Sequence, residues 1–235
     1  MPADDTKFSL RSIAVAAFGP SLLFGLGEGA IFPVIALSAK GLGASVALSG
    51  LIVALFGIGT LINTIPAAMV TTRYGERRAM VGASIFSVFA LILCLLAPYA
   101  WVLGLGVFMI GMANAVFMLA RQTYLLEAVP ISMRARAMST LGGTMRIGLF
   151  IGPFAGAALM HFIDLPGAYL VAIAATVGAG ILSYMLPDLE APKSTTQAKK
   201  PGPRINDLLH AHAKVYVTLG TACSLVSAIR AVVKS

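Results

Sequence analysis

Residues 166–187 form an apolar run without a single charged side chain. A helix of about 20 residues crosses the hydrocarbon core of a bilayer, so a run of this length can span it. Seven such runs predict an all-α fold, a polytopic bundle of transmembrane helices. Six further runs have comparable length and apolarity, at residues 12–37, 45–70, 79–99, 101–120, 138–162 and 213–233.

The composition agrees with a chain that lies mostly in lipid. Hydrophobic residues make up 58% of the sequence and charged residues 11%, whereas soluble domains are about one quarter charged. The formal net charge of +8 would suggest a nucleic-acid partner in a soluble protein. Here Lys and Arg, with Arg121 among them, concentrate in alternate connections between the runs, as the positive-inside rule describes for cytoplasmic segments. The pattern predicts a multi-pass protein of the cell membrane with a cytoplasmic N-terminus and no nucleic-acid partner.

The polar segments divide the chain into three parts. Residues 1–187 are predicted to form a six-helix transmembrane bundle, residues 188–212 a basic cytoplasmic linker, and residues 213–235 a seventh transmembrane helix. His210 and His212 are two residues apart, a spacing that does not place both on one helix face. The sequence contains no metal-binding cluster, no nucleophile–base pair and no phosphate-binding loop, so it predicts no metal, no cofactor and no enzymatic activity.

The fifth run contains a regular pattern of glycines. Gly148, Gly152 and Gly156 recur at every fourth residue and therefore share one helix face. Small residues in membrane helices let two backbones approach closely. Pro153 removes one backbone donor and is expected to bend the helix. These residues predict a tight contact with a second helix.

The first run contains one acidic residue, Glu28, flanked by Gly25, Gly27 and Gly29. An ionisable side chain within a membrane span is by default a functional candidate. Removal from water makes the protonated carboxyl the cheaper form, so a carboxylate here can gain and lose a proton. The alternative is a neutral, hydrogen-bonded structural Glu. Gly25, Glu28 and Gly29 also correspond, at a constant offset, to Gly111, Asn114 and Ala115 in the fourth run, a weak sign of a three-helix inverted repeat.

The glycine pattern resembles a known motif. Gly148-x-x-x-Gly152-Pro153-x-x-Gly156 is similar to the antiporter motif in helix 5 of drug/proton exporters of the major facilitator superfamily (MFS). The whole chain resembles the N-terminal half of such a transporter plus helix 7. That resemblance implies an MFS-type six-helix half and a chain truncated relative to the family, whose members normally have twelve or fourteen helices.

The connection between the second and third runs gives a further match. Arg73, Gly75, Arg77 and Arg78 are similar to the family's Gly-x-x-x-Asp-Arg-x-Gly-Arg-Arg loop. Gly75 permits a tight turn, and the arginines suit an anionic headgroup surface. Thr72 stands where the family has Asp, so the charge that helps to hold the cytoplasmic gate there is missing. In the fourth run Val107 stands where many relatives carry Arg.

The resemblance implies secondary active transport. Its partners would be the bilayer, protons and a small lipophilic or cationic substrate, exported by proton-coupled antiport through alternating access. Glu28 is the expected proton-exchanging acid, and Arg146 is the first candidate for its counter-ion on the substrate path, although Arg146 could instead extend toward the cytoplasm. The alternative function is a non-transporting fragment, or a subunit that needs a second half or a second copy. Asn63, among other polar residues, could face a cavity or cap a helix.

Overall fold

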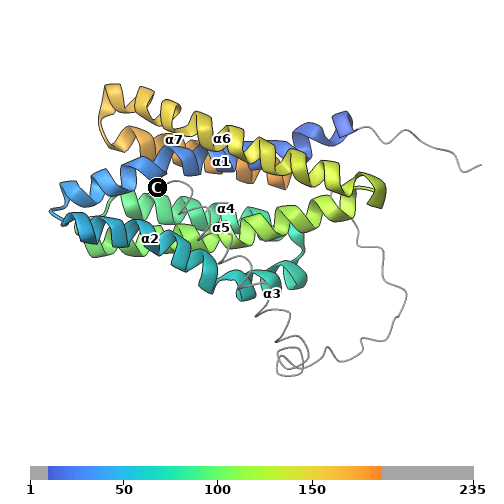
Figure 1. Ribbon diagram of the computed structural model, residues 1–235, viewed down its shortest axis with the longest axis horizontal. Helices are drawn as coiled ribbons and strands as arrows, with labels where there is room; N and C mark the ends of the chain where they lie inside the picture. Colours follow the sequence, from blue (N-terminus) through green and yellow to red (C-terminus); the bar gives the residue numbers. More distant parts are fainter. Residues whose placement is uncertain (1–9, 187–235) are drawn as a thin grey trace, which may run out of the picture. The chain divides into compact units, whose positions relative to one another are not determined.

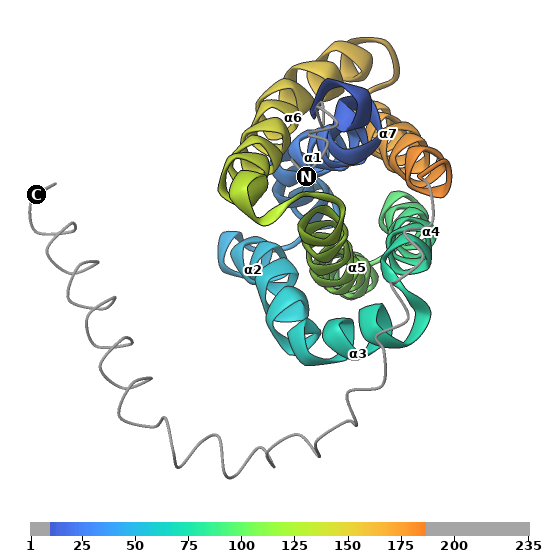
Figure 2. The same ribbon diagram turned by 90° about the vertical axis from the view of Figure 1, so that its right-hand side faces the viewer.

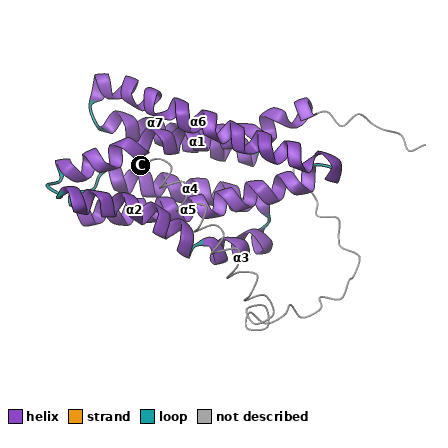
Figure 3. Ribbon diagram, viewed as in Figure 1, coloured by secondary structure: helices purple, strands orange, loops and turns teal. Residues whose placement is uncertain are grey.

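The computed structural model describes residues 10–186, with side chains from Phe18 onward (Figure 1). Every element of this part is helical, which confirms the all-α prediction (Figure 3). The predicted linker and seventh helix lie outside the described residues. The helices are α1 (Leu10–Gly41), α2 (Val46–Ile62), α3 (Thr64–Tyr74), α4 (Glu76–Leu95), α5 (Ala100–Ala128), α6 (Arg134–Ile163) and α7 (Pro166–Tyr184), with one 3₁₀ turn at Ile131–Met133.

The helices correspond to the first six predicted spans. Five are each long and apolar enough to cross a membrane, and α2 with α3 makes a sixth span that is bent by 50°. The bend falls at Asn63, between the two helices. Pro66 has no N–H to donate to the carbonyl of Ile62, so the helical hydrogen-bond ladder is interrupted at this point. The sequence analysis predicted one continuous run there, because apolarity does not reveal a break.

The fourth span is longer than the sequence predicted. Apolarity ends near Ala120, but α5 continues through Arg121 to Ala128. Val129 is extended, with φ −115° and ψ 134°, and Pro130 follows it. A residue before proline is disfavoured in the helical region, so proline and not charge ends this helix. The extension changes the role open to Arg121, because it places that residue in a helix and not in a connection.

Viewed along the helices, α1 lies between α6 and α7, and α5 lies between α2 and α4 (Figure 2). The α3–α4 and α5–α6 connections meet at one end of the bundle, which we call the arginine-rich end because it contains Arg73, Arg77, Arg78, Arg134 and Arg136. The α1–α2, α4–α5 and α6–α7 connections lie at the opposite end. The grouping of these arginines at one end agrees with the charge pattern of the sequence.

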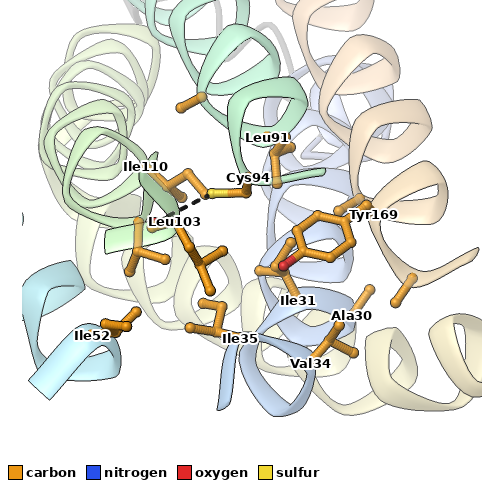
Figure 4. Close-up of a cluster of buried hydrophobic side chains, with 14 of the residues drawn as sticks. Ala30, Ile31, Val34, Ile35, Ile52, Leu91, Cys94, Leu103, Ile110 and Tyr169 are labelled. Carbon is orange, nitrogen blue, oxygen red and sulfur yellow. Dashed lines mark hydrogen bonds between the residues drawn. The ribbon is translucent and has the colours of Figure 1, made fainter. Parts of the chain in front are cut away.

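A core of large apolar side chains fills the half of the bundle near the opposite end (Figure 4). Ile31 and Ile35 of α1 pack with Leu103 and Ile110 of α5 and with side chains of α2, α4 and α7. The one cysteine of the described part, Cys94, is buried here. Ser38 of α1 and Tyr169 of α7 are hydrogen-bonded at 2.8 Å beside this core and join their two helices.

The packing follows the weak repeat that the sequence suggested. A Cβ at Gly25 of α1 would overlap the carbonyl of Met145 in α6, and a Cβ at Gly111 of α5 would overlap that of Phe56 in α2. Gly111 follows Gly25 by 86 residues, and Met145 follows Phe56 by 89. The same two offsets relate the reciprocal contacts, which are Gly148 with Leu22 and Gly59 with Phe108. The α1–α6 and α5–α2 seams are therefore equivalent, as expected for a 3+3 inverted repeat.

Candidate functional site

The contact surface between α1 and α5 changes character along its length. Near the opposite end it is apolar, as described above for the core. Toward the arginine-rich end it contains polar side chains that lie on the facing sides of both helices. Ser21 and Glu28 of α1, and Asn114 and Arg121 of α5, are all buried, with at most 7% of each side chain exposed. A buried polar layer within a membrane span is the feature of this bundle that apolar packing does not explain.

Two stacked phenylalanines lie within this polar layer. Phe24 and Phe117 have ring centroids 3.9 Å apart and planes inclined by 7°. Ser21 is one turn from Phe24 and Arg121 one turn from Phe117, both toward the arginine-rich end. Glu28 is one turn from Phe24 and Asn114 one turn from Phe117, both toward the opposite end of the bundle. The backbones of Glu28 and Arg121 are therefore separated along the bundle by the stacked rings.

The direction of the side chains reduces this separation. Side chains of a helix lean toward its N-terminus. Since α1 and α5 are antiparallel, Glu28 leans toward the arginine-rich end and Arg121 leans away from it. The guanidinium of Arg121 reaches Met145 on α6, and Met145 is level with Gly25 on α1. Glu28 and Arg121 accordingly interact electrostatically.

Glycines leave Glu28 little room to turn away from α5. Gly25 and Gly29 lie against the backbone of α6, where an added Cβ would come within 2.6 Å of the carbonyls of Met145 and Leu149. Gly27 lies against α7, where an added Cβ would lie 3.0 Å from Oγ1 of Thr176. Close packing on these two sides directs Glu28 toward the remaining side, which faces α5. The glycines that flank Glu28 in sequence thus have a packing role.

The polar groups of this layer are not fully paired. Within the described part of the chain, Oε1 of Glu28, Oδ1 of Asn114, and Nε and Nη1 of Arg121 have no hydrogen-bond partner. Arg121 donates to the thioether of Met145, 3.0 Å from Nη2. Thioether sulfur is a weak acceptor, whereas a guanidinium carries five donors. Buried polar groups are normally satisfied, so this layer holds unused donors beside an unused acceptor.

The counter-ion suggested by the sequence is not the residue that the structure brings to Glu28. Arg146 is exposed on α6, on the same face as Phe150 and Phe154, and Arg121 interacts with Glu28 in its place. The sequence analysis missed Arg121 because it counted this residue among the cytoplasmic cations. Its spacing of seven from Asn114 places both on one helix face and was the available signal. A role of Arg146 on a substrate path stays a prediction.

The glycines of the helix 5 motif form the seam between α6 and α1. A Cβ at Gly148 would overlap the carbonyl of Leu22, and a Cβ at Gly152 would overlap that of Leu26 and the amide of Ala30. Gly156 is less crowded, because its Cβ would lie 3.4 Å from the carbonyl of Ala30. The predicted close approach of two helices is therefore present, with α1 as the second helix. Its part in antiport stays a prediction.

The residues of the loop motif lie at the arginine-rich end. Gly75 joins α3 to α4 with φ +83°, a conformation that suits glycine. The guanidinium of Arg73 lies 5.8 Å from the ring centre of the adjacent Tyr74, and that of Arg77 lies 4.9 Å from the ring centre of Tyr184 on α7. Thr72 donates its hydroxyl to the carbonyl of Ala68, within its own helix.

Comparison with known proteins gives the family. The sequence matches the Major Facilitator Superfamily over residues 18–233. "Multidrug resistance protein MdtG" of Escherichia fergusonii is 26% identical over 173 residues, which are 71% of this chain and 42% of that protein. The Enterobacter lignolyticus protein of the same name is 27% identical, over 69% of this chain and 40% of its own length. "Uncharacterized MFS-type transporter YfkF" of Bacillus subtilis is 28% identical over 63% of this chain and 38% of its own.

The chain thus spans about two fifths of the length of the curated relatives that it matches. The match covers nearly the whole sequence, and the helices, the paired seams and the charge distribution agree with it. The chain therefore belongs to the major facilitator superfamily of multi-pass membrane transporters.

Proposed function

We propose that this chain acts as a proton-coupled exporter, with its N-terminus in the cytoplasm and Glu28 as the proton-exchanging acid. The observation that carries the proposal is the buried, incompletely paired carboxyl of Glu28 beside Arg121. The relatives named for multidrug resistance favour a small lipophilic or cationic molecule as the exchanged substrate.

A proton exchange at Glu28 has a physical basis in the charges of this layer. Burial of an uncompensated charge is costly, so Glu28 and Arg121 are each more stable when the other is present. An ionised Glu28 offers oxygen acceptors to the unused donors of Arg121, whereas a protonated Glu28 leaves Arg121 with the thioether of Met145. Gain and loss of one proton would thereby change which helix Arg121 binds, α1 or α6. Alternating access requires such a coupling between charge and helix contact.

Exchange can be measured in proteoliposomes that contain the full chain. An imposed pH gradient should drive movement of ethidium, a lipophilic cation, in the wild-type chain. Glu28→Gln keeps the shape and removes the titratable group, and it should abolish this exchange. Glu127→Gln is the matched control, because Glu127 is exposed near the end of α5 and its substitution changes the net charge equally.

The outcomes separate the roles. If Glu28→Gln moves ethidium at the wild-type rate, Glu28 is structural and the proposal fails. If Glu127→Gln is as defective as Glu28→Gln, the loss reflects net charge and not the buried site. Arg121→Lys should retain part of the exchange and Arg121→Leu none, because only the first keeps a positive charge at this position.

A second candidate function is that of a subunit completed by another six-helix half. The apolar stretch of the span at residues 131–163 is 17% buried within the structure, against 44–61% for the other four single-helix spans. Phe150 and Phe154 are 69% and 64% exposed, and Arg146 lies on the same face. An arginine that faces lipid within a span is costly, so this face of α6 suits a protein partner or a polar cavity. Cross-linking through a cysteine at Phe150 would test for a second copy, and absence of ethidium exchange by the chain alone would favour this role.

A further inference from the structure

A pocket lies where α3 passes beside α4 and α5 (Figure 2), and we call it the α3 pocket. It encloses about 330 Å³, a volume within the range of small-molecule sites. The 50° bend between α2 and α3 sets the direction of α3, which forms one wall. None of the four buried polar side chains around Glu28 lines this pocket, so it is separate from the candidate site described above.

The shape of the α3 pocket suits a planar ring. Its floor consists of residues with side chains no larger than a methyl group, which are Ala79, Gly82, Ala83 and Ala113. A Cβ added at Gly82 would meet nothing within 4 Å, so there is free room beside α4 at this point. Tyr74 of α3 and Phe86 of α4 also line the pocket, and 55% and 37% of these residues are exposed. Aromatic side chains next to a flat floor favour an aromatic ligand, because rings stack on one another.

Asn63 lines the end of the pocket farther from the arginine-rich end, because α3 runs from Asn63 toward the arginine-rich end. Asn63 is only 7% exposed, and its Nδ2 donates to the carbonyl of Met112 at 2.8 Å. Among residues 18–186 no group donates a hydrogen bond to its Oδ1. A buried acceptor without a donor is costly, so a ligand with a hydroxyl group at this end would gain affinity from it.

Arg78 lines the pocket from the first turn of α4, at the arginine-rich end. It is exposed, and it forms no ion pair or hydrogen bond with another residue of the described part. A guanidinium binds a carboxylate through two parallel hydrogen bonds. Arg78 and Phe86 both line the pocket and are eight residues apart on α4, or roughly 12 Å. The pocket is therefore elongated, with a cation at one end and an acceptor at the other.

We propose that the α3 pocket binds an aromatic carboxylate whose ring carries a hydroxyl group at the far end, as in 4-hydroxycinnamate. Arg78 binds the carboxylate, the ring lies on the floor of small residues, and the hydroxyl donates to Oδ1 of Asn63. A fatty acid would leave this oxygen without a donor, so the pocket favours the hydroxylated aromatic acid. The site does not depend on the proton exchange proposed above and can be tested without a transport assay.

The first test compares two acids that differ only in the hydroxyl group. Equilibrium dialysis of the full chain in lipid nanodiscs would measure binding of radiolabelled 4-hydroxycinnamate and cinnamate, with empty nanodiscs as the background. The hydroxylated acid should bind about fivefold more tightly, the effect of one hydrogen bond. In Asn63→Leu the two acids should bind equally, because the acceptor of the hydroxyl group is absent.

The second test removes the cation or the space. Arg78→Gln should weaken binding of both acids about tenfold, because a hydrogen bond to a charged group is stronger than a neutral one. Arg136→Gln is the matched control, since Arg136 is exposed at the same end but lies on α6. Gly82→Leu fills the pocket and should abolish binding. Gly143→Leu is its control, because Gly143 also has nothing within 4 Å of an added Cβ and lies on α6.

Four results would overturn the proposal. Equal affinity of the wild-type chain for the two acids would show that Asn63 accepts no hydrogen bond from the ligand, and so would a preference that persists in Asn63→Leu. An equal loss in Arg136→Gln would indicate a general charge effect. Unchanged binding in Gly82→Leu would exclude the pocket. If Asn63→Leu fails to fold, comparison of the two acids on Gly82→Leu and Gly143→Leu still shows whether the preference arises in this pocket.

Discussion

The seam between α1 and α6 predicts a graded response to added methyl groups along one helix. The glycines of α6 differ in what a Cβ would meet. Gly143 has nothing within 4 Å, Gly156 would have ordinary contacts at 3.4–3.5 Å, and Gly152 would overlap backbone atoms of Leu26 and Ala30. Each glycine to alanine change adds the same methyl group, so the stability of the three variants isolates the effect of crowding.

The magnitudes follow from the two opposing effects of the substitution. Alanine is more favourable than glycine within a helix by about 0.5–1 kcal/mol, which stabilises Gly143→Ala. Overpacking costs about 1–3 kcal/mol, and the atoms that Gly152→Ala would displace belong to backbone, which cannot rotate away. The helix gain subtracted from the overpacking cost leaves about 0–2.5 kcal/mol of destabilisation for Gly152→Ala, so at about 2–4 °C per kcal/mol its Tm should fall by up to about 10 °C. Gly143→Ala should raise Tm slightly, and Gly156→Ala should lie between them.

Thermal unfolding of the full chain in detergent, followed by circular dichroism at 222 nm, would measure this order. The reasoning is refuted if Gly152→Ala unfolds at the same temperature as Gly143→Ala, because α6 would then tolerate a side chain where the structure leaves no room. A similar loss in all three variants would also refute it, since it would show sensitivity to alanine anywhere in α6.

Three further substitutions test other contacts. Asn63→Leu removes the hydrogen bond from Nδ2 to the carbonyl of Met112 at 2.8 Å. Such a bond contributes about 0.6–1 kcal/mol in membrane proteins, so Tm should fall by about 1–4 °C. An unchanged Tm would contradict the contact. Phe117→Ala removes a fully buried ring and should cost about 3–5 kcal/mol, seen as unfolding at a far lower temperature, whereas native-like unfolding would contradict its burial. In a Cys223→Ser background, Cys94 should react with a maleimide only on unfolding, because 4% of its side chain is exposed; rapid labelling of the folded chain would contradict this.

The sequence was sufficient for the features that depend on apolarity and spacing. The spans followed from the length of the runs, because lipid leaves a helix as the only spanning structure for segments of that length. The close contact of Gly148 and Gly152 followed from their four-residue spacing, although their partner helix did not. The family followed from the same motif together with the loop at Gly75, and the comparison confirmed it.

The features that the sequence did not reveal depend on which helices meet. The break at Asn63 is invisible to apolarity, since both sides of it are apolar. Arg121 looked like a topological cation because its run of apolar residues had ended, yet α5 continues for two further turns. Arg146 was chosen as counter-ion because it lies within a predicted span, and its place in the sequence does not say which way its side chain points around the helix. In the structure α1 faces α5 at this level, and Arg121 of α5 is the cation that interacts with Glu28.

The two equivalent seams of the repeat are chemically different. In the α2–α5 seam, Thr60 donates to the carbonyl of Gly111 at 3.0 Å and Asn63 to that of Met112. In the α1–α6 seam the corresponding positions are Leu149 and Gly152, and no side-chain hydrogen bond joins these two helices among residues 18–186. Directional bonds fix the longitudinal register of one pair, whereas backbone contact between glycines resists separation but not sliding. We therefore expect the α2–α5 pair to resist sliding of one helix along the other more strongly than the α1–α6 pair. Translation of α6 along α1 would carry Met145 past Arg121.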